Sequence, residues 1–179
     1  AAKVTYPANV TLIAAMNPCR CGYYSHPTKP CTCSPADVKR YISRISGPLL
    51  DRIDIEVELP SLSYDELSQK EPTGECSAVI RERVIRARAF AADRMQGESG
   101  IFCNAQLDAR LSKKYCTMTQ EASAVLHMAV ERMGMSMRAY GRVIKVARTI
   151  ADLAGEDVIG MEHVAEAIQY RELDGKYWA

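Results

Sequence analysis

The chain has 179 residues, of which 47% are hydrophobic and 25% charged, and its formal net charge is +1. This composition is ordinary for a soluble globular protein of one domain or two small ones. The near-zero charge excludes a whole-molecule field that would attract nucleic acid or a membrane surface, and no apolar stretch approaches the ~20 residues of a membrane span.

The seven cysteines are unevenly spread, and four of them lie within fifteen residues. An odd number is atypical of a secreted disulfide framework, and Cys76, Cys103 and Cys116 are scattered through helical or loop sequence. This usage favours a reduced, cytoplasmic setting with one metal or thiol cluster.

A continuous apolar run over residues 10–16 predicts a fully buried, parallel strand. The run ends at Asn17, so the strand would carry a polar amide at its end. In a sheet that cleaves nucleotides, an amide at such a position can contact a phosphate. Ser34 then caps a helix that stops at Gly47, and residues 53–59 alternate in period two as a second strand with one wet face. Strand, loop, helix and strand together predict an α/β fragment.

The second half of the chain carries helical signals. Residues 61–76 are polar and turn-rich and predict a linker, and residues 77–95 predict a helix that carries five arginines. The arginines of that helix either face solvent or contact nucleic acid phosphates. They do not lie along a single face of the helix. The remaining elements of a small helical bundle are a short helix from Asn104 to Leu111, helices from Thr119 to Gly134 and from Ser136 to Gly155, and a last helix over 161–172.

Two Cys-x-Cys pairs form the most concentrated motif. They consist of Cys19, Cys21, Cys31 and Cys33. Four thiolates could close a tetrahedral Zn²⁺ site, and zinc would stabilise a loop that has almost no apolar core of its own. The alternative is a set of reduced thiols or labile disulfides in a packed loop, because Cys-x-Cys is less diagnostic than Cys-x-x-Cys. His26 could replace one cysteine as a ligand.

Two arginines stand at positions that suggest an anionic partner. Arg52 follows an apolar Leu-Leu segment and is either a surface cation paired with Asp51 or Asp54, or a group that reaches the γ-phosphate on a neighbouring subunit. Arg138 lies in the first turn of its predicted helix, where the helix dipole disfavours a cation. An anionic ligand would compensate for that position, although Glu131 or another acid could do the same.

Six strings of sequence, taken together, carry a family resemblance. They are NPCRCGYY at 17–24, CTCSP at 31–35, YISRISGPLLDRID at 41–54, SMRAY at 136–140, ARTIADL at 147–153 and HVAEAIQYR at 163–171. These strings resemble the magnesium-chelatase-like AAA+ ATPases of the ComM/YifB type, and they span nearly the whole chain.

The resemblance implies a role for each candidate residue. Asn17 matches sensor 1, which positions the attacking water, Arg52 matches the arginine finger, and Arg138 matches sensor 2, acting either on its own or on a neighbour's nucleotide. The family further implies ATP with Mg²⁺, a homo-hexamer, and a motor on branched or single-stranded DNA that promotes branch migration in DNA uptake and recombination. No membrane partner is implied.

The resemblance also implies a division of the chain. Residues 1–62 would be the last strands and intervening helix of an AAA+ P-loop NTPase core, with the Cys-rich loop at 18–34. Residues 63–100 would be a linker with the arginine-rich helix, and residues 101–179 an all-α lid.

A complete family member carries a GxxxxGK[ST] loop and an acidic Mg²⁺-binding strand, and this sequence contains neither. We therefore expect a C-terminal fragment that does not hydrolyse ATP alone. The alternatives from other classes are a zinc-dependent interaction or DNA-binding module without catalysis, and a subunit of a magnesium-chelatase-type ATPase.

Overall fold

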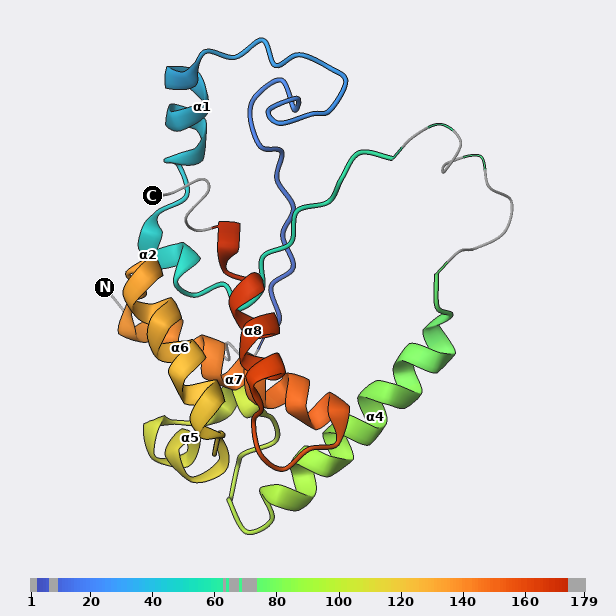
Figure 1. Cartoon of the computed structure of the whole chain (residues 1–179), viewed down its shortest axis with the longest axis vertical. Helices are drawn as coiled ribbons and strands as arrows, with labels where there is room; N and C mark the ends of the chain where they lie inside the picture. Colours follow the sequence, from blue (N-terminus) through green and yellow to red (C-terminus); the bar gives the residue numbers. More distant parts are fainter. Residues whose placement is uncertain (1–2, 7–9, 63, 65–67, 69–73, 174–179) are drawn as a thin grey trace. The chain divides into compact units, whose positions relative to one another are not determined.

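The computed structural model describes residues 3–6, 10–62, 64, 68 and 74–173, and the described part is built from helices and loops (Figure 1). The chain divides into two compact units, Ala1–Arg44 and Ile45–Ala179. Most of the predicted linker, at 63, 65–67 and 69–73, and the end of the predicted lid, at 174–179, lie outside the described residues. No described helix is long and apolar enough to cross a membrane.

The described residues of the first unit contain one helix, α1 (Pro35–Ile42), which begins where the sequence predicts it. The Asp37 amide donates to the Ser34 hydroxyl oxygen at 3.2 Å, and that hydroxyl donates to the Asp37 carboxylate at 2.7 Å. The bond from Ser34 lowers the pKa of Asp37 below its usual value. Val38 and Ile42 are buried, so the apolar face predicted for this helix is confirmed.

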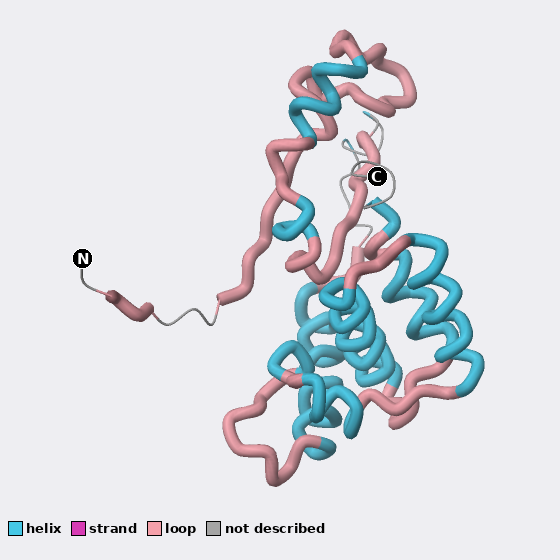
Figure 2. Tube along the Cα trace, turned by 90° about the vertical axis from the view of Figure 1, so that its left-hand side faces the viewer, coloured by secondary structure: helices cyan, strands magenta, loops and turns pink. Residues whose placement is uncertain are grey.

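The two predicted strands do not form among the described residues, where residues 10–16 and 53–59 are loops (Figure 2). An extended segment becomes a strand only when its N–H and C=O groups pair with a neighbouring strand, and neither segment has a ladder partner here. The prediction that residues 10–16 are buried is also wrong, since Val10 is 80% exposed and Ile13 is 91% exposed.

The second unit is a helical bundle. Its described helices are α2 (Gly47–Leu50), α4 (Ser77–Arg94), the 3₁₀ turn η1 (Asn104–Gln106), α5 (Ala109–Tyr115), α6 (Gln120–Met133), α7 (Met137–Ala154) and α8 (Met161–Gln169). Two details differ from the sequence prediction. Asp108, not Asn104, caps α5 by accepting from the Leu111 amide at 2.7 Å, and Gly47 begins the short helix α2.

The caps of α6 and α7 follow the sequence closely. Thr119 and Ser136 each accept a hydrogen bond from an amide in the first turn, at 3.1 Å in both cases. Gly134 and Gly155 end these helices in the left-handed conformation, with φ of 59° and 76°, which glycine adopts without a Cβ penalty. The ends of both helices are therefore determined locally.

Helix α7 lies at the centre of the bundle and packs against α4 and α8, while α6 packs against α8. The buried core residues come from the end of α4 and from the segments that follow it through α8: Ala91, Met95, Leu107, Leu111, Tyr115, Cys116, Ala122, Leu126, Val143, Ala147, Ala151, Ile159, Val164 and Ala167. One isolated parallel bridge, between Met118 and Ile159, joins the segment before α6 to the segment before α8.

A buried polar network ties α4 to α7. Arg94 and Arg148 both donate to the Asp152 carboxylate, at 2.9 Å and 3.1 Å, and Asn104 donates to it at 2.7 Å. Arg148 is fully buried and also donates to the Asp157 carbonyl at 2.6 Å. Because the charges are paired and hydrogen-bonded, their burial is tolerated, and the network holds the bundle in one arrangement.

Candidate metal centre and arginine groove

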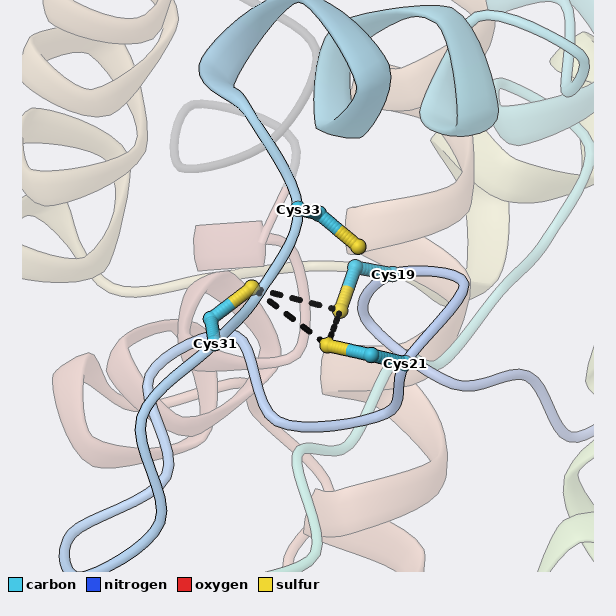
Figure 3. A group of neighbouring side chains, drawn as sticks. All are labelled: Cys19, Cys21, Cys31 and Cys33. Carbon is cyan, nitrogen blue, oxygen red and sulfur yellow. Dashed lines mark hydrogen bonds between the residues drawn. The ribbon is translucent and has the colours of Figure 1, made fainter.

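The four cysteines of the two Cys-x-Cys pairs converge on one point in the first unit (Figure 3). The sulfur of Cys19 lies 3.3 Å from that of Cys21 and 3.7 Å from that of Cys31, and Cys21 and Cys31 are 3.5 Å apart. The sulfur of Cys33 completes a group within 4.8 Å, and none of the four is in a disulfide.

These distances suit a tetrahedral thiolate site. With Zn–S bonds of about 2.3 Å, the sulfur atoms of a tetrahedral site lie about 3.8 Å apart. Cys19 is fully buried and the other three are partly buried, so the donor set faces inward. The cluster could therefore hold one metal ion. His26 lies outside it, and its Nδ1 accepts from the amides of Thr28 and Lys29 at 3.2 and 3.0 Å.

The thiols of the cluster differ in how easily they ionise. Hydrogen bonds from the backbone amides of Tyr23 and Thr32 lower the pKa of Cys21 to about 5. The Cys33 amide acts in the same direction on Cys31, but desolvation and the neighbouring sulfur atoms outweigh it and raise the pKa of Cys31 to about 12. The Cys21 thiolate therefore forms readily, whereas a second thiolate beside it is disfavoured. A bound cation would stabilise the additional negative charge.

Asn17 lies directly before this cluster and is exposed. Its side chain is close to Gly22, where an added Cβ would lie 3.9 Å from the amide group. Asn17 therefore lies between the extended segment 10–16 and the Cys-rich loop.

Arg52 and Arg138 line the same groove of the second unit, although 86 positions separate them in the sequence. The groove has a volume of about 990 Å³ and is mostly apolar, with Ile55, Leu107, Met118, Met137, Ile144 and Leu153 among its lining residues. Its charged lining residues are Arg52, Lys113, Arg138, Arg142 and Lys145 on the basic side and Asp54, Asp108 and Glu166 on the acidic side. The excess of basic groups suits an anionic ligand.

Neither arginine is neutralised by the acids that the sequence offered as partners. Arg52 is exposed and donates to the Pro48 carbonyl, whereas Asp51 accepts from the Ser136 hydroxyl at 3.0 Å and Asp54 pairs with Arg142. The predicted alternative of an ion pair with Asp51 or Asp54 is therefore wrong among the described residues.

Arg138 is likewise exposed and forms no ion pair with a described residue. The acid proposed for it, Glu131, lies 3.7 Å from His127 instead. The guanidinium groups of Arg52 and Arg138 thus remain available to a ligand in the groove.

The turn that carries Arg52 is held from several sides. The buried Arg171 donates to the carbonyls of Leu50 and Ile53, at 3.3 and 2.6 Å, and so spans the residues on either side of Arg52. The Glu56 amide donates to the Tyr170 carbonyl at 3.0 Å. These bonds fasten the Arg52 turn to the end of α8.

The arginine-rich helix α4 uses some of its cations internally. Arg83 forms a two-pronged pair with Glu75 at 2.9 and 3.0 Å, and Arg94 belongs to the buried network. The other arginines, Arg81, Arg86 and Arg88, are exposed. The helix therefore does not present all five charges to a ligand.

Sequence reasoning missed the groove residues Arg142 and Lys145 and the capping role of His163. The signal for His163 was its place three residues after Gly160, whose amide donates to His163 Nδ1 at 2.9 Å. The partner of Arg142, Asp54, lies 88 positions away, and no local pattern connects the two.

Comparison with known proteins places the sequence of this chain in a family. The family model described as "Magnesium chelatase, subunit ChlI C-terminal" matches residues 74–171, which is more than half of the chain, and "Magnesium chelatase, subunit ChlI" matches residues 1–67. The chain belongs to the magnesium chelatase ChlI family. This membership confirms the resemblance drawn from the sequence strings.

Several relatives share almost the full length of this magnesium chelatase family chain. It is 42% identical over 173 residues to the uncharacterized protein YifB of Salmonella typhimurium and 39% identical over 172 residues to the competence protein ComM of Haemophilus influenzae. It is 36% identical over 169 residues to the uncharacterized protein Rv2897c of Mycobacterium tuberculosis. These alignments cover 97%, 96% and 93% of this chain and 33%, 32% and 32% of the relatives, so the chain spans about a third of their length.

Proposed function

We propose that the chain is the C-terminal part of an ATP-driven DNA-remodelling motor, a homo-hexamer that promotes branch migration during DNA uptake and recombination. Membership in the magnesium chelatase family supports an ATPase subunit as the class of the parent protein. The match to a competence protein supports DNA as the substrate. A cytoplasmic location remains part of the proposal.

One observation carries the catalytic part of the proposal: Arg52 and Arg138 line one groove, and neither forms an ion pair with an acid in the part of the chain that the structure describes. In this proposal Arg52 is the arginine finger and Arg138 is sensor 2. Because both belong to one compact unit, they would act on the same nucleotide, which a neighbouring subunit binds. Two cations at the γ-phosphate would stabilise the charge that develops during phosphoryl transfer.

Asn17 would serve as sensor 1 at the end of residues 10–16. The exposed apolar side chains of this segment support its place in a larger sheet, because such a run is normally covered. We propose that residues 1–62 complete an AAA+ core, that 63–100 connect it, and that 101–179 form the lid. The phosphate-cradling loop and the Mg²⁺-binding carboxylate would come from residues outside this sequence.

The Cys-rich loop would bind one Zn²⁺ through Cys19, Cys21, Cys31 and Cys33. Its role in the proposal is structural, since a closed four-cysteine site leaves no coordination position for a substrate. Bound zinc would hold the loop next to Asn17 in a fixed conformation.

The test of the catalytic proposal uses the full-length parent protein. Arg52→Ala and Arg138→Ala should each lower kcat for ATP hydrolysis by about 10³-fold or more while nucleotide binding is largely retained. Arg132→Ala, an exposed arginine of α6 outside the groove, is the matched control. Full ATPase activity in the Arg52 and Arg138 variants would instead favour a zinc-dependent interaction module without a catalytic share.

A second measurement separates the DNA motor from a magnesium-chelatase-type subunit. Branched or single-stranded DNA should stimulate the ATPase activity of the parent protein. Activity that is unchanged by either DNA would contradict the motor and support the chelatase-type subunit.

A further inference from the structure

The loop between the two cysteine pairs differs in charge from the rest of the chain. Residues 18–34 contain two basic residues, Arg20 and Lys29, and no aspartate or glutamate. From there to the end of the first unit, Lys39, Arg40 and Arg44 add to this excess, and Asp37 is the one acid. The whole chain has a net charge of only +1, so this unit concentrates positive charge locally.

The same loop exposes two neighbouring aromatic rings. Tyr23 is 37% exposed and Tyr24 is 40% exposed. Their exposure beside basic residues matches the composition of surfaces that stack nucleic acid bases.

The loop backbone that carries these rings is fixed rather than open. The Gly22 amide donates to the Cys19 carbonyl at 3.1 Å, and the His26 amide donates to the Tyr23 carbonyl at 3.1 Å. Gly22 has a φ of 81°, which lets the chain turn sharply out of the cysteine cluster. A preorganised loop loses less entropy when it binds a ligand.

Lys29 and His26 surround one of the rings. The Lys29 ammonium lies 5.2 Å from the centre of the Tyr23 ring, and the His26 ring meets it edge-on with centroids 5.6 Å apart. Because the Lys29 ammonium lies over one face of the Tyr23 ring, a base would stack on the opposite face and have this cation close to its phosphate. His26 holds Lys29 in place by accepting from its backbone amide.

We propose that the loop of residues 20–30 is a contact site for single-stranded DNA. Tyr23 and Tyr24 stack on unpaired bases, and Arg20 and Lys29 contact the phosphates. The four-cysteine cluster anchors both ends of the loop and takes no direct part in binding. Stacking requires unpaired bases, and the loop offers no helix or ribbon for the major groove, so a single strand fits better than a duplex.

This inference rests on the proposed function only in taking DNA as the partner. Binding of a single strand by the loop requires no ATP hydrolysis, so the two proposals can fail separately. An anionic protein would be attracted by the same charges, and the comparison with polyglutamate below separates it from DNA.

The experiment measures binding of the full-length parent protein to a fluorescently labelled oligothymidylate of about 20 nucleotides, by anisotropy at several salt concentrations. Tyr23→Ala and Tyr24→Ala should each weaken binding about 5- to 150-fold, while Tyr23→Phe and Tyr24→Phe should bind like the wild type. Lys29→Gln should reduce the slope of log K against log salt by about 1. Tyr64→Ala, which removes an exposed tyrosine of the other unit, is the control.

Unchanged affinity in both alanine variants would overturn the proposal, and so would binding of polyglutamate as tight as that of the oligonucleotide. Zinc content and urea unfolding of each variant show that the loop is intact. If the alanine variants bind DNA normally while DNA still stimulates their ATPase activity, the loop proposal fails and the motor proposal stands. If Arg52→Ala retains ATPase activity while the tyrosine variants lose DNA binding, the reverse holds.

Discussion

The guanidinium group of Arg171 lies 2.6 Å from the carbonyl oxygen of Ile53, 118 positions earlier in the chain. Arg171 is 1% exposed, and it reaches the carbonyl of Leu50 as well. Through these bonds the end of α8 determines the shape of the turn that carries Arg52. Arg171 would thus position Arg52, the residue that we propose to contact the nucleotide.

Replacement of this arginine should therefore reduce both stability and activity. Arg171→Met removes two hydrogen bonds and leaves the carbonyls buried, at a cost of about 1–3 kcal/mol in the free energy of unfolding. Urea unfolding of the chain measures this cost, with Arg132→Met as the exposed control. In the parent protein the same variant should lower kcat more than it raises KM for ATP. A variant as stable as the wild type would contradict the role of Arg171 in the fold.

The buried Asp152 should be among the most sensitive positions of the bundle. It accepts hydrogen bonds from Arg94, Arg148 and Asn104. Asp152→Ala would leave buried cations without a partner and should cost about 3–5 kcal/mol. Asp93→Ala, which removes an exposed acid of α4, should change stability by less than about 0.5 kcal/mol. Similar urea midpoints for the two variants would contradict this account.

The contribution of Glu98 to stability should depend on pH. Hydrogen bonds from Lys114 and Tyr115 lower the pKa of its carboxyl group below the usual 4.5. A depressed pKa in the folded state stabilises the fold above the unfolded value, and this contribution is lost as the pH falls through the folded value. Glu98→Gln should therefore destabilise the chain at pH 7 and have a smaller effect near pH 3.

Urea midpoints of Glu98→Gln and the wild type at the two pH values measure this dependence. Glu82→Gln, which changes an exposed glutamate of α4, is the control. An equal loss of stability for Glu98→Gln at pH 7 and pH 3 would show that the ionised carboxylate is unimportant.

The cysteine cluster should retain metal during purification without added zinc. We expect about one equivalent of Zn²⁺ per chain, measured by mass spectrometry of the metal, and its loss in Cys19→Ser. The exposed Cys76 and Cys103 serve as controls, since serine at either position should leave the zinc content unchanged. A wild-type content below about 0.3 equivalents would contradict a zinc site.

The helices of the second unit were predictable because their signals are local. Thr119 and Ser136 cap the helices that the sequence assigned to them, and Gly134 and Gly155 end these two helices. A cap depends on atoms within four residues, so the chain around it need not be known. The Asn104 prediction was wrong because Asp108, four residues on, is an equally good cap and begins α5.

The two strand predictions were wrong because strand formation depends on residues that are distant in the sequence. Alternating or continuous apolar residues at 10–16 and 53–59 are compatible with a strand, but the hydrogen bonds of a strand come from a neighbour that local pattern does not specify. The exposed Val10 and Ile13 show that an apolar run alone does not produce burial.

By itself, the sequence determined the helical bundle, the helix ends, the two cysteine pairs and the family, because spacing within a few residues or direct similarity carries each of them. Only the tertiary structure decided that four sulfur atoms meet within 4.8 Å and that Arg52 and Arg138 line one groove. It also decided that Asp54 pairs with Arg142, which leaves Arg52 without that acid. The pair of Arg142 and Asp54 joins residues 88 positions apart, and packing of the second unit creates it, whereas the turns of the Cys-rich loop bring the sulfur atoms together.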